Sequence, residues 1–342
     1  MKTLLVGKTA TGIETYTLEN DNGMRADIIT YGARIQRLFV PDKAGKPIDV
    51  VAGFDDPEQF RDDYGTYFNA IIGRVGNRIE KGRFCLNGKE YTLYKNDGNN
   101  HLHGGKSGFD DKLWTAQASE DGSLTLTYLS ADGEEGYPAN LRVQVTYSLS
   151  NNNALTIAYE AESDGDTLCS LTNHAYFNLD GDFETALDHE IFINADVLTD
   201  VDDELIPHGE ILPVQGTAFD FSTPKRLGKD INGDERLLKI ARGGYDFNYV
   251  LCEHTADEAV AAAYSAKSGI AMSVYTDRPC MQFYTGNFLS GFTGKKRYPY
   301  QSAFCMETQG YPNACNVPSF PNMTLKAGEK YKTSTKYKFD IK

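Results

Sequence analysis

Apolar and polar residues alternate along much of the chain in short runs that are typical of β-strands. The clearest stretch, 123–162, contains three such runs separated by turn residues such as Asn151-Asn152-Asn153. A strand with one apolar face and one polar face belongs in an antiparallel sheet that buries one side. Runs of the same kind extend this prediction towards both ends of the chain, over 13–18, 24–30, 33–40 and 331–339.

Turn and cap residues refine these assignments. The pair Asn87-Gly88 predicts a tight hairpin over 83–94, because both residues tolerate the left-handed backbone that such turns need. Asp56 and the following Pro57 predict a brief helix over 56–61. The segment 257–264 has high helix propensity, yet a turn and an alternating run, 270–276, follow it. We therefore interpret 257–276 as a β-hairpin.

One predicted strand, residues 171–179, has an unusual polar side. Side chains two positions apart share a face of a strand, so Thr172, His174, Tyr176 and Asn178 form one row. A hydroxyl, an imidazole, a phenol and an amide in a row suit a concave surface that hydrogen-bonds a polar ligand, whereas a dry core does not tolerate them. His174 is the candidate acid–base group of this row.

Composition supports an all-β fold. Aromatic residues make up 12% of the 342 residues, and 32 glycines provide tight turns. The chain has no Pro- or Gly-rich linker, no repeat and no charged block that would separate domains. We predict a single domain over 1–342, a large antiparallel β-sandwich.

Charge and cysteine usage narrow the classes of partner. The chain has 48 acidic and 34 basic residues and a formal net charge of −14, which argues against nucleic acid and anionic membranes as partners. We see neither an apolar run long enough to span a membrane nor a signal peptide. The six cysteines are scattered without a C-x-x-C motif, as in reduced cytoplasmic proteins. The sequence does not distinguish a monomer from a homodimer.

Two basic motifs are candidates for ligand binding, and each has a plainer interpretation. Arg74 and Arg78 could form a guanidinium fork for sugar hydroxyls, or could be one structural arginine and one ion-paired arginine. His101 and His103 have a spacing found in metal-binding barrels, but Gly104 and Gly105 follow where such sites usually place a carboxylate. The glycines instead let the backbone approach a ligand closely, and either histidine alone could be a buried structural residue.

Three further polar residues stand out against apolar surroundings. Asp246 lies between a Gly pair and Phe247, where it could equally cap a turn. Gln282 begins a stretch that resembles the rim of a site. Glu307 follows Phe304-Cys305-Met306 within a predicted strand, and a carboxylate there is either on an exposed face or has a function.

Taken together and in this order, these motifs resemble the aldose 1-epimerase family, also called the galactose mutarotase family. Each motif alone has low specificity, but their order along nearly the whole chain is specific. The matching stretches are 73–79, 101–105, 172–178, 244–247, 282–287 and 307–313.

The resemblance implies a large β-sandwich with an open sugar cleft, no cofactor and no metal, which interconverts the α and β anomers of free aldoses. It implies that His174 is the acid, that Glu307 is the base and that the family's second histidine is His103 and not His101. It also implies sugar binding by Asn77, Arg78 and Asp246. Tyr176 and Gln282, which lie within matching stretches, are further candidate sugar-binding residues.

The chemistry of anomer exchange agrees with these residue types. Opening a pyranose requires a base for the proton on O1 and an acid for the ring oxygen, and a Glu with a His can exchange these states. We expect burial to raise the pKa of Glu307, and a nearby protonated His and Arg78 to lower it again. The alternatives are a hexose-6-phosphate 1-epimerase, a sugar-binding β-sandwich without turnover, and a metal-dependent cupin.

Overall fold

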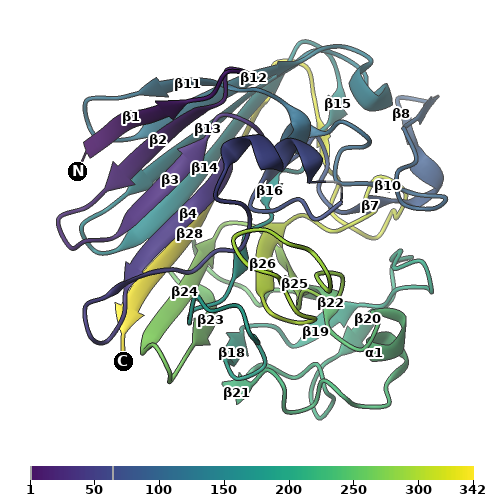
Figure 1. Ribbon diagram of the computed structural model, residues 1–342. Helices are drawn as coiled ribbons and strands as arrows, with labels where there is room; N and C mark the ends of the chain where they lie inside the picture. The colour runs from purple at the N-terminus through teal and green to yellow at the C-terminus, as the bar shows by residue number, and fades with distance from the viewer. Residues whose placement is uncertain (1, 64) are drawn as a thin grey trace.

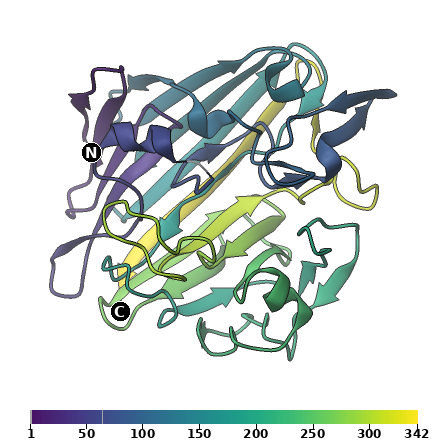
Figure 2. The same cartoon turned by 45° about the vertical axis from the view of Figure 1, so that its right-hand side comes forward.

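Three antiparallel sheets form the body of the protein in a computed structural model that describes residues 2–63 and 65–342 (Figure 1). The largest sheet has nine strands, and its C-terminal strand lies near the middle of the sheet (Figure 1, Figure 2). In spatial order its strands are β11 (Thr115–Ala118), β12 (Leu124–Ser130), β13 (Leu141–Leu149), β14 (Ala154–Ser163), β28 (Lys330–Ile341), β24 (Ile270–Thr276), β23 (Ala259–Tyr264), β18 (Glu190–Ile193) and β21 (Lys225–Arg226).

Two smaller sheets complete this body. The first has five strands in chain order: β1 (Lys2–Lys8), β2 (Glu14–Glu19), β3 (Arg25–Ile29), β4 (Arg34–Pro41) and β5 (Pro47–Asp49). The second has six strands in the spatial order β17 (Tyr176–Phe177), β26 (Phe304–Gln309), β25 (Cys280–Tyr284), β22 (Asp246–Val250), β19 (Val197–Thr199) and β20 (Ile211–Pro213).

Short elements join the sheets. The two-stranded pairs are β6 (Ile71–Ile72) with β16 (Thr172–Asn173), β7 (Arg78–Ile79) with β10 (His101–Leu102), β8 (Arg83–Leu86) with β9 (Lys89–Thr92), and β15 (Thr167–Leu168) with β27 (Thr324–Leu325). The helices are α1 (Arg236–Ile240) and the 3-10 turns η1 (Pro57–Asp62), η2 (Glu80–Gly82), η3 (Phe109–Asp111) and η4 (Glu134–Gly136). No helix in the described part of the chain is long and apolar enough to cross a bilayer.

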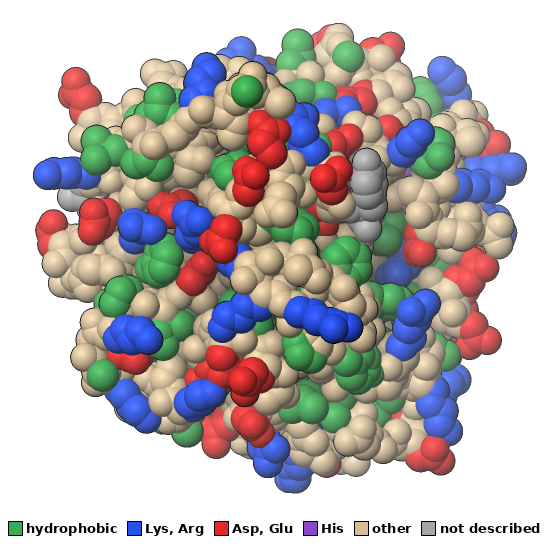
Figure 3. All heavy atoms as spheres, in the orientation of Figure 1, with side chains coloured by type: hydrophobic (Ala, Val, Ile, Leu, Met, Phe, Trp, Pro, Cys, Tyr) green, Lys and Arg blue, Asp and Glu red, His purple; other side chains and the backbone are tan. Residues whose placement is uncertain are grey.

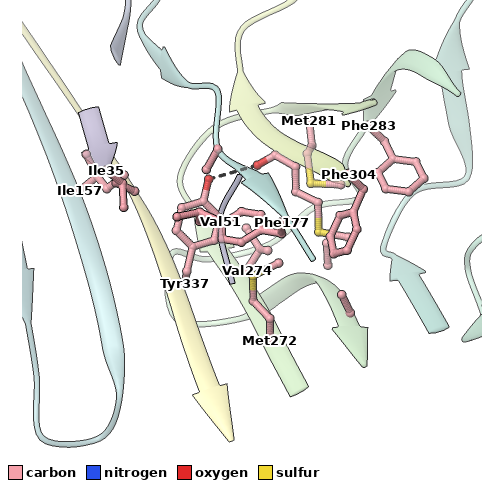
Figure 4. Close-up of a cluster of buried hydrophobic side chains, with 14 of the residues drawn as sticks. Ile35, Val51, Ile157, Phe177, Met272, Val274, Met281, Phe283, Phe304 and Tyr337 are labelled. Atoms are coloured by element: carbon pink, nitrogen blue, oxygen red, sulfur yellow. Dashed lines mark hydrogen bonds between the residues drawn. The ribbon is translucent and has the colours of Figure 1, made fainter. Parts of the chain in front are cut away.

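The main core lies between the nine-stranded sheet and the two smaller sheets. Ile35 of β4 and Ile157 of β14 belong to it, as do Phe304 of β26 and Tyr337 of β28 (Figure 4). The hydroxyl of Tyr337 donates to the carbonyl of Met306 at 3.2 Å, so a buried polar atom on one sheet is satisfied by the other. The six-stranded sheet is thereby held with one face against the core.

Most of the elements predicted from the alternation are confirmed. The antiparallel all-β architecture is present, and the hairpin at Asn87-Gly88 joins β8 to β9. Residues 257–276 contain the hairpin of β23 and β24 despite their helix propensity, because both strands pair within the large sheet. The side chain of Asp56 accepts from the backbone N–H of Glu58 and caps η1.

The predicted continuous strand over 171–179 is wrong. It is divided into β16 and β17, which pair with β6 and β26 respectively. The break occurs at His174, whose backbone bonds to Ala70 and Asn69 instead of to a neighbouring strand. The predicted polar row is therefore split: the side chain of Asn178 donates to the carbonyls of Thr185 and Ser302 and has a structural role.

Candidate active site

The register of the six-stranded sheet places distant polar residues side by side. Its inner face packs on the core, and its outer face supports the site. In one row across β17, β26, β25 and β22, the partners in the ladder are Tyr176, Cys305, Tyr284 and Asp246. In the next row, Glu307 of β26 lies directly opposite Gln282 of β25.

Strand alternation explains why a carboxylate lies within an apolar strand. In β26, Phe304 and Met306 point into the core, so Cys305 and Glu307 point to the opposite face. Glu307 is nevertheless only 1% exposed, and its Oε2 has no hydrogen-bond partner among the described residues. A buried carboxylate with an unused oxygen is costly for stability and is typical of a residue kept for function.

His174 completes the second row. It lies two residues before Tyr176, and its Nε2 is 3.7 Å from Oε1 of Glu307. Its ring stacks on Tyr176 with 5.0 Å between ring centroids, and its Nδ1 lies 3.6 Å from Sγ of Cys305. These contacts hold the imidazole with Nε2 directed at the carboxylate.

Burial shifts the pKa values of His174 and Glu307 in opposite directions and reverses their usual order. It lowers the pKa of His174 to about 3, and burial, reinforced by Asp246, raises the pKa of Glu307 well above its usual range while Arg78 opposes that rise. The expected lowering by a nearby protonated histidine is not found, because burial also lowers the pKa of His103 well below its usual range. Burial therefore disfavours the protonated form of both imidazoles.

The segments around β7 and β10 supply the facing wall. The backbone N–H of Asn77 donates to Nδ1 of His103 at 3.0 Å, which leaves the proton of the neutral ring on Nε2. Nε of Arg78 donates to Asp97 at 2.8 Å. Asn77 and His103 both have a positive φ, at 65° and 51°, and strained backbone of this kind concentrates at functional sites.

A network of side-chain amides fixes the polar floor of the site. Nε2 of Gln282 donates to Asp246 at 2.7 Å, and Nε2 of Gln309 donates to Asn248 at 2.9 Å. Burial raises the pKa of Asp246, while Arg78 and the amide of Gln282 lower it. The floor thus presents a carboxylate oriented by its neighbours.

A pocket of about 180 Å³ lies between these segments. All eight predicted site residues border it, namely His103, His174, Glu307, Asn77, Arg78, Asp246, Tyr176 and Gln282. The other lining residues are Gly65, Tyr67, Asp97, Leu102, Tyr284 and Phe288.

Four of these additional residues were missed by sequence reasoning, namely Gly65, Tyr67, Asp97 and Phe288. Tyr67 contacts both site histidines, with ring centroids 4.7 Å from His103 and 6.0 Å from His174. Asp97 and Phe288 lie in loops without a motif of their own. Only their position in the fold reveals them, because no pattern in the sequence separates them from ordinary loop residues.

Two residues of the predicted motifs lie outside the pocket. The guanidinium fork is wrong, because Arg74 is buried and donates to Ser130, Thr167 and three backbone carbonyls. Nδ1 and Nε2 of His101 lie 2.6 Å from the carbonyl of Tyr94 and 2.7 Å from the hydroxyl of Tyr137. Both residues are structural, which is the plainer of the two interpretations.

The site could also accommodate a divalent cation. His103, His174 and Glu307 each offer a ligand atom, and these atoms lie within 4.8 Å of one another. Two imidazoles and a carboxylate are donors that Zn²⁺ accepts. The alternative of a metal pair made by His101 and His103, which Gly104 and Gly105 already disfavoured, is not formed, because Nε2 of His101 is directed to the hydroxyl of Tyr137 and His101 does not line the pocket.

Fold and site together define a β-sandwich in which an imidazole and a carboxyl group face each other in a polar pocket. The family description aldose 1-epimerase matches residues 14–338. The chain is 44% identical over 333 residues to galactose mutarotase of Sus scrofa, covering 96% of this chain and 94% of the relative. It is 34% identical over 328 residues to aldose 1-epimerase of Escherichia coli K12, covering 94% of each.

A solved structure agrees with these relatives. The crystal structure of an aldose epimerase homologue from C. elegans superimposes with a TM-score of 0.89 at 32% identity, covering 96% of this chain and 99% of that one. The chain belongs to the aldose 1-epimerase family.

Proposed function

We propose that this protein is an aldose 1-epimerase that interconverts the α and β anomers of a free aldohexose such as galactose or glucose. The observation on which this rests is the 3.7 Å approach of His174 Nε2 to Glu307 Oε1 within a pocket lined by hydrogen-bonding groups. Relatives named galactose mutarotase and aldose 1-epimerase support the same activity.

The short distance between acid and base suits ring opening. The base removes the proton of O1 while the acid protonates the ring oxygen, and both oxygens are bonded to C1. A pair that serves two oxygens on one carbon has to be close together. Glu307 takes the O1 proton and His174 protonates the ring oxygen; after rotation about the C1–C2 bond, the reverse transfers close the ring on the other face.

Burial also changes the relative free energies of the two protonation states of Glu307 and His174. Ring opening converts a carboxylate with an imidazolium into a carboxylic acid with a neutral imidazole. In water the charged pair is favoured, but burial raises the pKa of Glu307 and lowers that of His174 to about 3. Burial therefore favours the neutral pair, which is the state of the two side chains that ring opening produces.

The remaining groups hold the sugar. Asp246, oriented by Gln282, accepts from hydroxyls, and Asn77 and Arg78 lie beside it in the pocket lining. His103 donates from Nε2, because its Nδ1 already accepts from the backbone of Asn77. Tyr176 supports the ring of His174 from below and adds an aromatic wall.

A free sugar fits this lining better than a phosphorylated one. Arg78 is the only Lys or Arg among the lining residues of the described chain, and it is paired with Asp97. Asp97, Asp246 and Glu307 contribute carboxyl groups to the same lining. A dianionic phosphate would therefore meet unfavourable charge, so mutarotation of glucose should be accelerated much more than that of glucose 6-phosphate.

Polarimetry of freshly dissolved α-galactose and α-glucose, with and without protein, tests the activity directly. Accelerated approach to anomeric equilibrium is the expected result. Saturable galactose binding without acceleration would instead favour a sugar-binding β-sandwich. Retained activity after dialysis against EDTA separates the proposed mechanism from a metal-dependent one at His103, His174 and Glu307.

A cytoplasmic location is part of the same proposal. All six cysteines are free thiols, which is compatible with a reducing, cytoplasmic environment.

Acidic and basic side chains are interspersed on the face shown in Figure 3. We propose a small-molecule substrate, with neither nucleic acid nor a membrane as a partner.

A further inference from the structure

We infer that a second pocket, separate from the candidate active site, binds a small oxyanion through Arg278. This Arg278 pocket has a volume of about 180 Å³ and shares no lining residue with the candidate active site. Its lining residues are Cys169, Arg278, Pro279, Gly310, Tyr311, Pro321, Asn322, Met323, Thr324, Leu325 and Tyr331.

The guanidinium of Arg278 is largely unused by the protein. Within residues 2–63 and 65–342 no carboxylate lies within ion-pair distance of it. Its Nε is buried without an acceptor, and its only side-chain hydrogen bond among those residues is a long one of 3.4 Å from Nη2 to Ser170 Oγ. A guanidinium has five N–H donors, and a buried donor without a partner costs free energy.

The surroundings keep this guanidinium in place beside open space. Its Cζ lies 5.6 Å from the ring centroid of Tyr331. A Cβ at Gly310 would lie 2.7 Å from Nη2 of Arg278 and 3.1 Å from Oγ of Ser170, so only glycine leaves room for this arrangement. The planar group is thus packed against an aromatic ring and a backbone, which lowers the entropy lost when it binds a ligand.

The charge of the lining selects the class of ligand. None of its residues is acidic, although the chain has 48 acidic and 34 basic residues. One uncompensated cation therefore faces the cavity, with the amide of Asn322 and the hydroxyl of Thr324 on the same lining. Met323 and Leu325 add apolar walls. A carboxylate or phosphate group is the shared chemistry that this combination recognises.

Titration calorimetry at constant ionic strength tests the inference, with inorganic phosphate in one arm and acetate in the other. The two arms show whether the site prefers a phosphate or a carboxylate. We expect one-to-one saturable binding of at least one anion in the millimolar range. Arg278→Gln should abolish it, and Arg278→Lys should weaken acetate more than phosphate, because lysine keeps the charge but loses the planar fork.

Two matched variants define the controls. Arg83→Gln removes an exposed arginine elsewhere and should leave anion binding unchanged. Arg78→Gln removes the arginine of the candidate active site and should also leave it unchanged. Because binding is measured without turnover, the result does not depend on the proposed epimerase activity.

Three results would overturn the inference. These are the absence of saturable binding of both anions, equal binding by folded Arg278→Gln protein, or loss of binding in Arg78→Gln protein. If thermal unfolding shows that Arg278→Gln does not fold, the anion affinity of Arg278→Lys is measured instead. Unchanged affinity for both anions in that variant would count against recognition by the guanidinium.

Discussion

His174 and Glu307 meet because of a strand register. Tyr176 of β17 pairs with Cys305 of β26, and counting two residues outward on each segment gives His174 and Glu307, with Nε2 and Oε1 3.7 Å apart. An antiparallel ladder brings such positions to the same face. Glu307 is therefore positioned by the ladder of β26 with β25, and His174 by the start of β17 together with its backbone hydrogen bonds to Asn69 and Ala70.

Glu307→Gln should remove most of the catalysis and leave the protein folded. The amide keeps the shape of the side chain but cannot accept the O1 proton, and loss of such a group costs about 10²–10⁴-fold in kcat. Thermal stability should be unchanged or higher, because a buried carboxylate with an unpartnered Oε2 is removed. Polarimetry gives kcat and thermal unfolding gives stability. A variant with near wild-type kcat would refute the role of the base.

His174→Asn should lower kcat to a similar extent. Asparagine keeps a polar side chain but has no group that can protonate the ring oxygen. If the two residues act as a unit, the double variant with Glu307→Gln should lose little more than either single variant. Rates of α-galactose mutarotation for the three variants test this. Independent, multiplicative losses would show that the two groups serve separate steps.

Asp246→Ala should mainly raise KM for galactose. Asp246 is oriented by the amide of Gln282 at 2.7 Å and lies in the pocket lining, one row away from Glu307. Losing a hydrogen bond from a sugar hydroxyl to a charged group corresponds to about 10- to 100-fold in affinity. Initial rates over a range of galactose concentrations separate KM from kcat. An unchanged KM would exclude the proposed binding role.

Cys305 offers a finer test of how His174 is held. Burial raises the pKa of its thiol well above the usual range, so the sulfur stays a neutral thiol, and it lies 3.6 Å from Nδ1 of His174. An imidazolium that gives up its Nε2 proton keeps a proton on Nδ1, and the sulfur can accept a weak hydrogen bond from that Nδ1–H. Cys305→Ala should therefore lower kcat about two- to tenfold with little change in KM.

Cys305→Ser is the matched control for that experiment. The hydroxyl retains an acceptor at nearly the same place, so this variant should recover most of the activity lost in Cys305→Ala. Equal activities of the alanine variant and the wild type would show that the imidazole is held without the thiol. A fall in thermal stability shared by both variants, without recovery of kcat by serine, would indicate a packing role alone.

The pattern of the sequence predicted the sheets because alternation is a local signal. Two examples are the hairpin of β8 with β9 and the strand β26, which contains Glu307. Both could be predicted from residues that are neighbours in the chain. The break at His174 did not follow, because it depends on backbone hydrogen bonds with Asn69, which donates to His174, and with Ala70, which accepts from it, about a hundred residues away. Long-range hydrogen bonds of this kind do not alter the local alternation of apolar and polar residues, so the sequence pattern does not reveal them.

The same distinction applies to the site. Glu307 could be named because a carboxylate in an apolar strand is conspicuous, whereas Asp246 and Gln282 were assigned to the site through their motifs and the family resemblance. Tyr67 could not, because an aromatic in a loop has no local feature that indicates contact with two histidines. Likewise, spacing alone cannot show that Arg78 faces the pocket while Arg74 faces the interior, since a kinked backbone does not keep the side-chain period of a regular strand.

A buried charge cluster beside the site should make stability depend on pH. Asp63 and Asp110 share the guanidinium of Arg34, with Nη1 2.6 Å from Asp63 and Nη2 3.8 Å from Asp110. One guanidinium does not neutralise two buried carboxylates. Burial is the main cause that raises the pKa of Asp110 to about 7, while Arg34 opposes the rise and Asp63 adds to it. A shift of this size corresponds to about 4 kcal/mol.

The sign of the effect follows from proton binding. The native protein keeps the proton on Asp110 up to about pH 7, whereas the unfolded chain releases it near the ordinary value of 3.8. The unfolded state therefore binds fewer protons between these values, and this group's contribution to stability, complete below pH 4, is lost as the pH rises through 7. Asp110→Asn should flatten the fall in unfolding free energy over this window, measured by urea denaturation at several pH values. Parallel curves for variant and wild type would show that Asp110 is already ionised in the native protein.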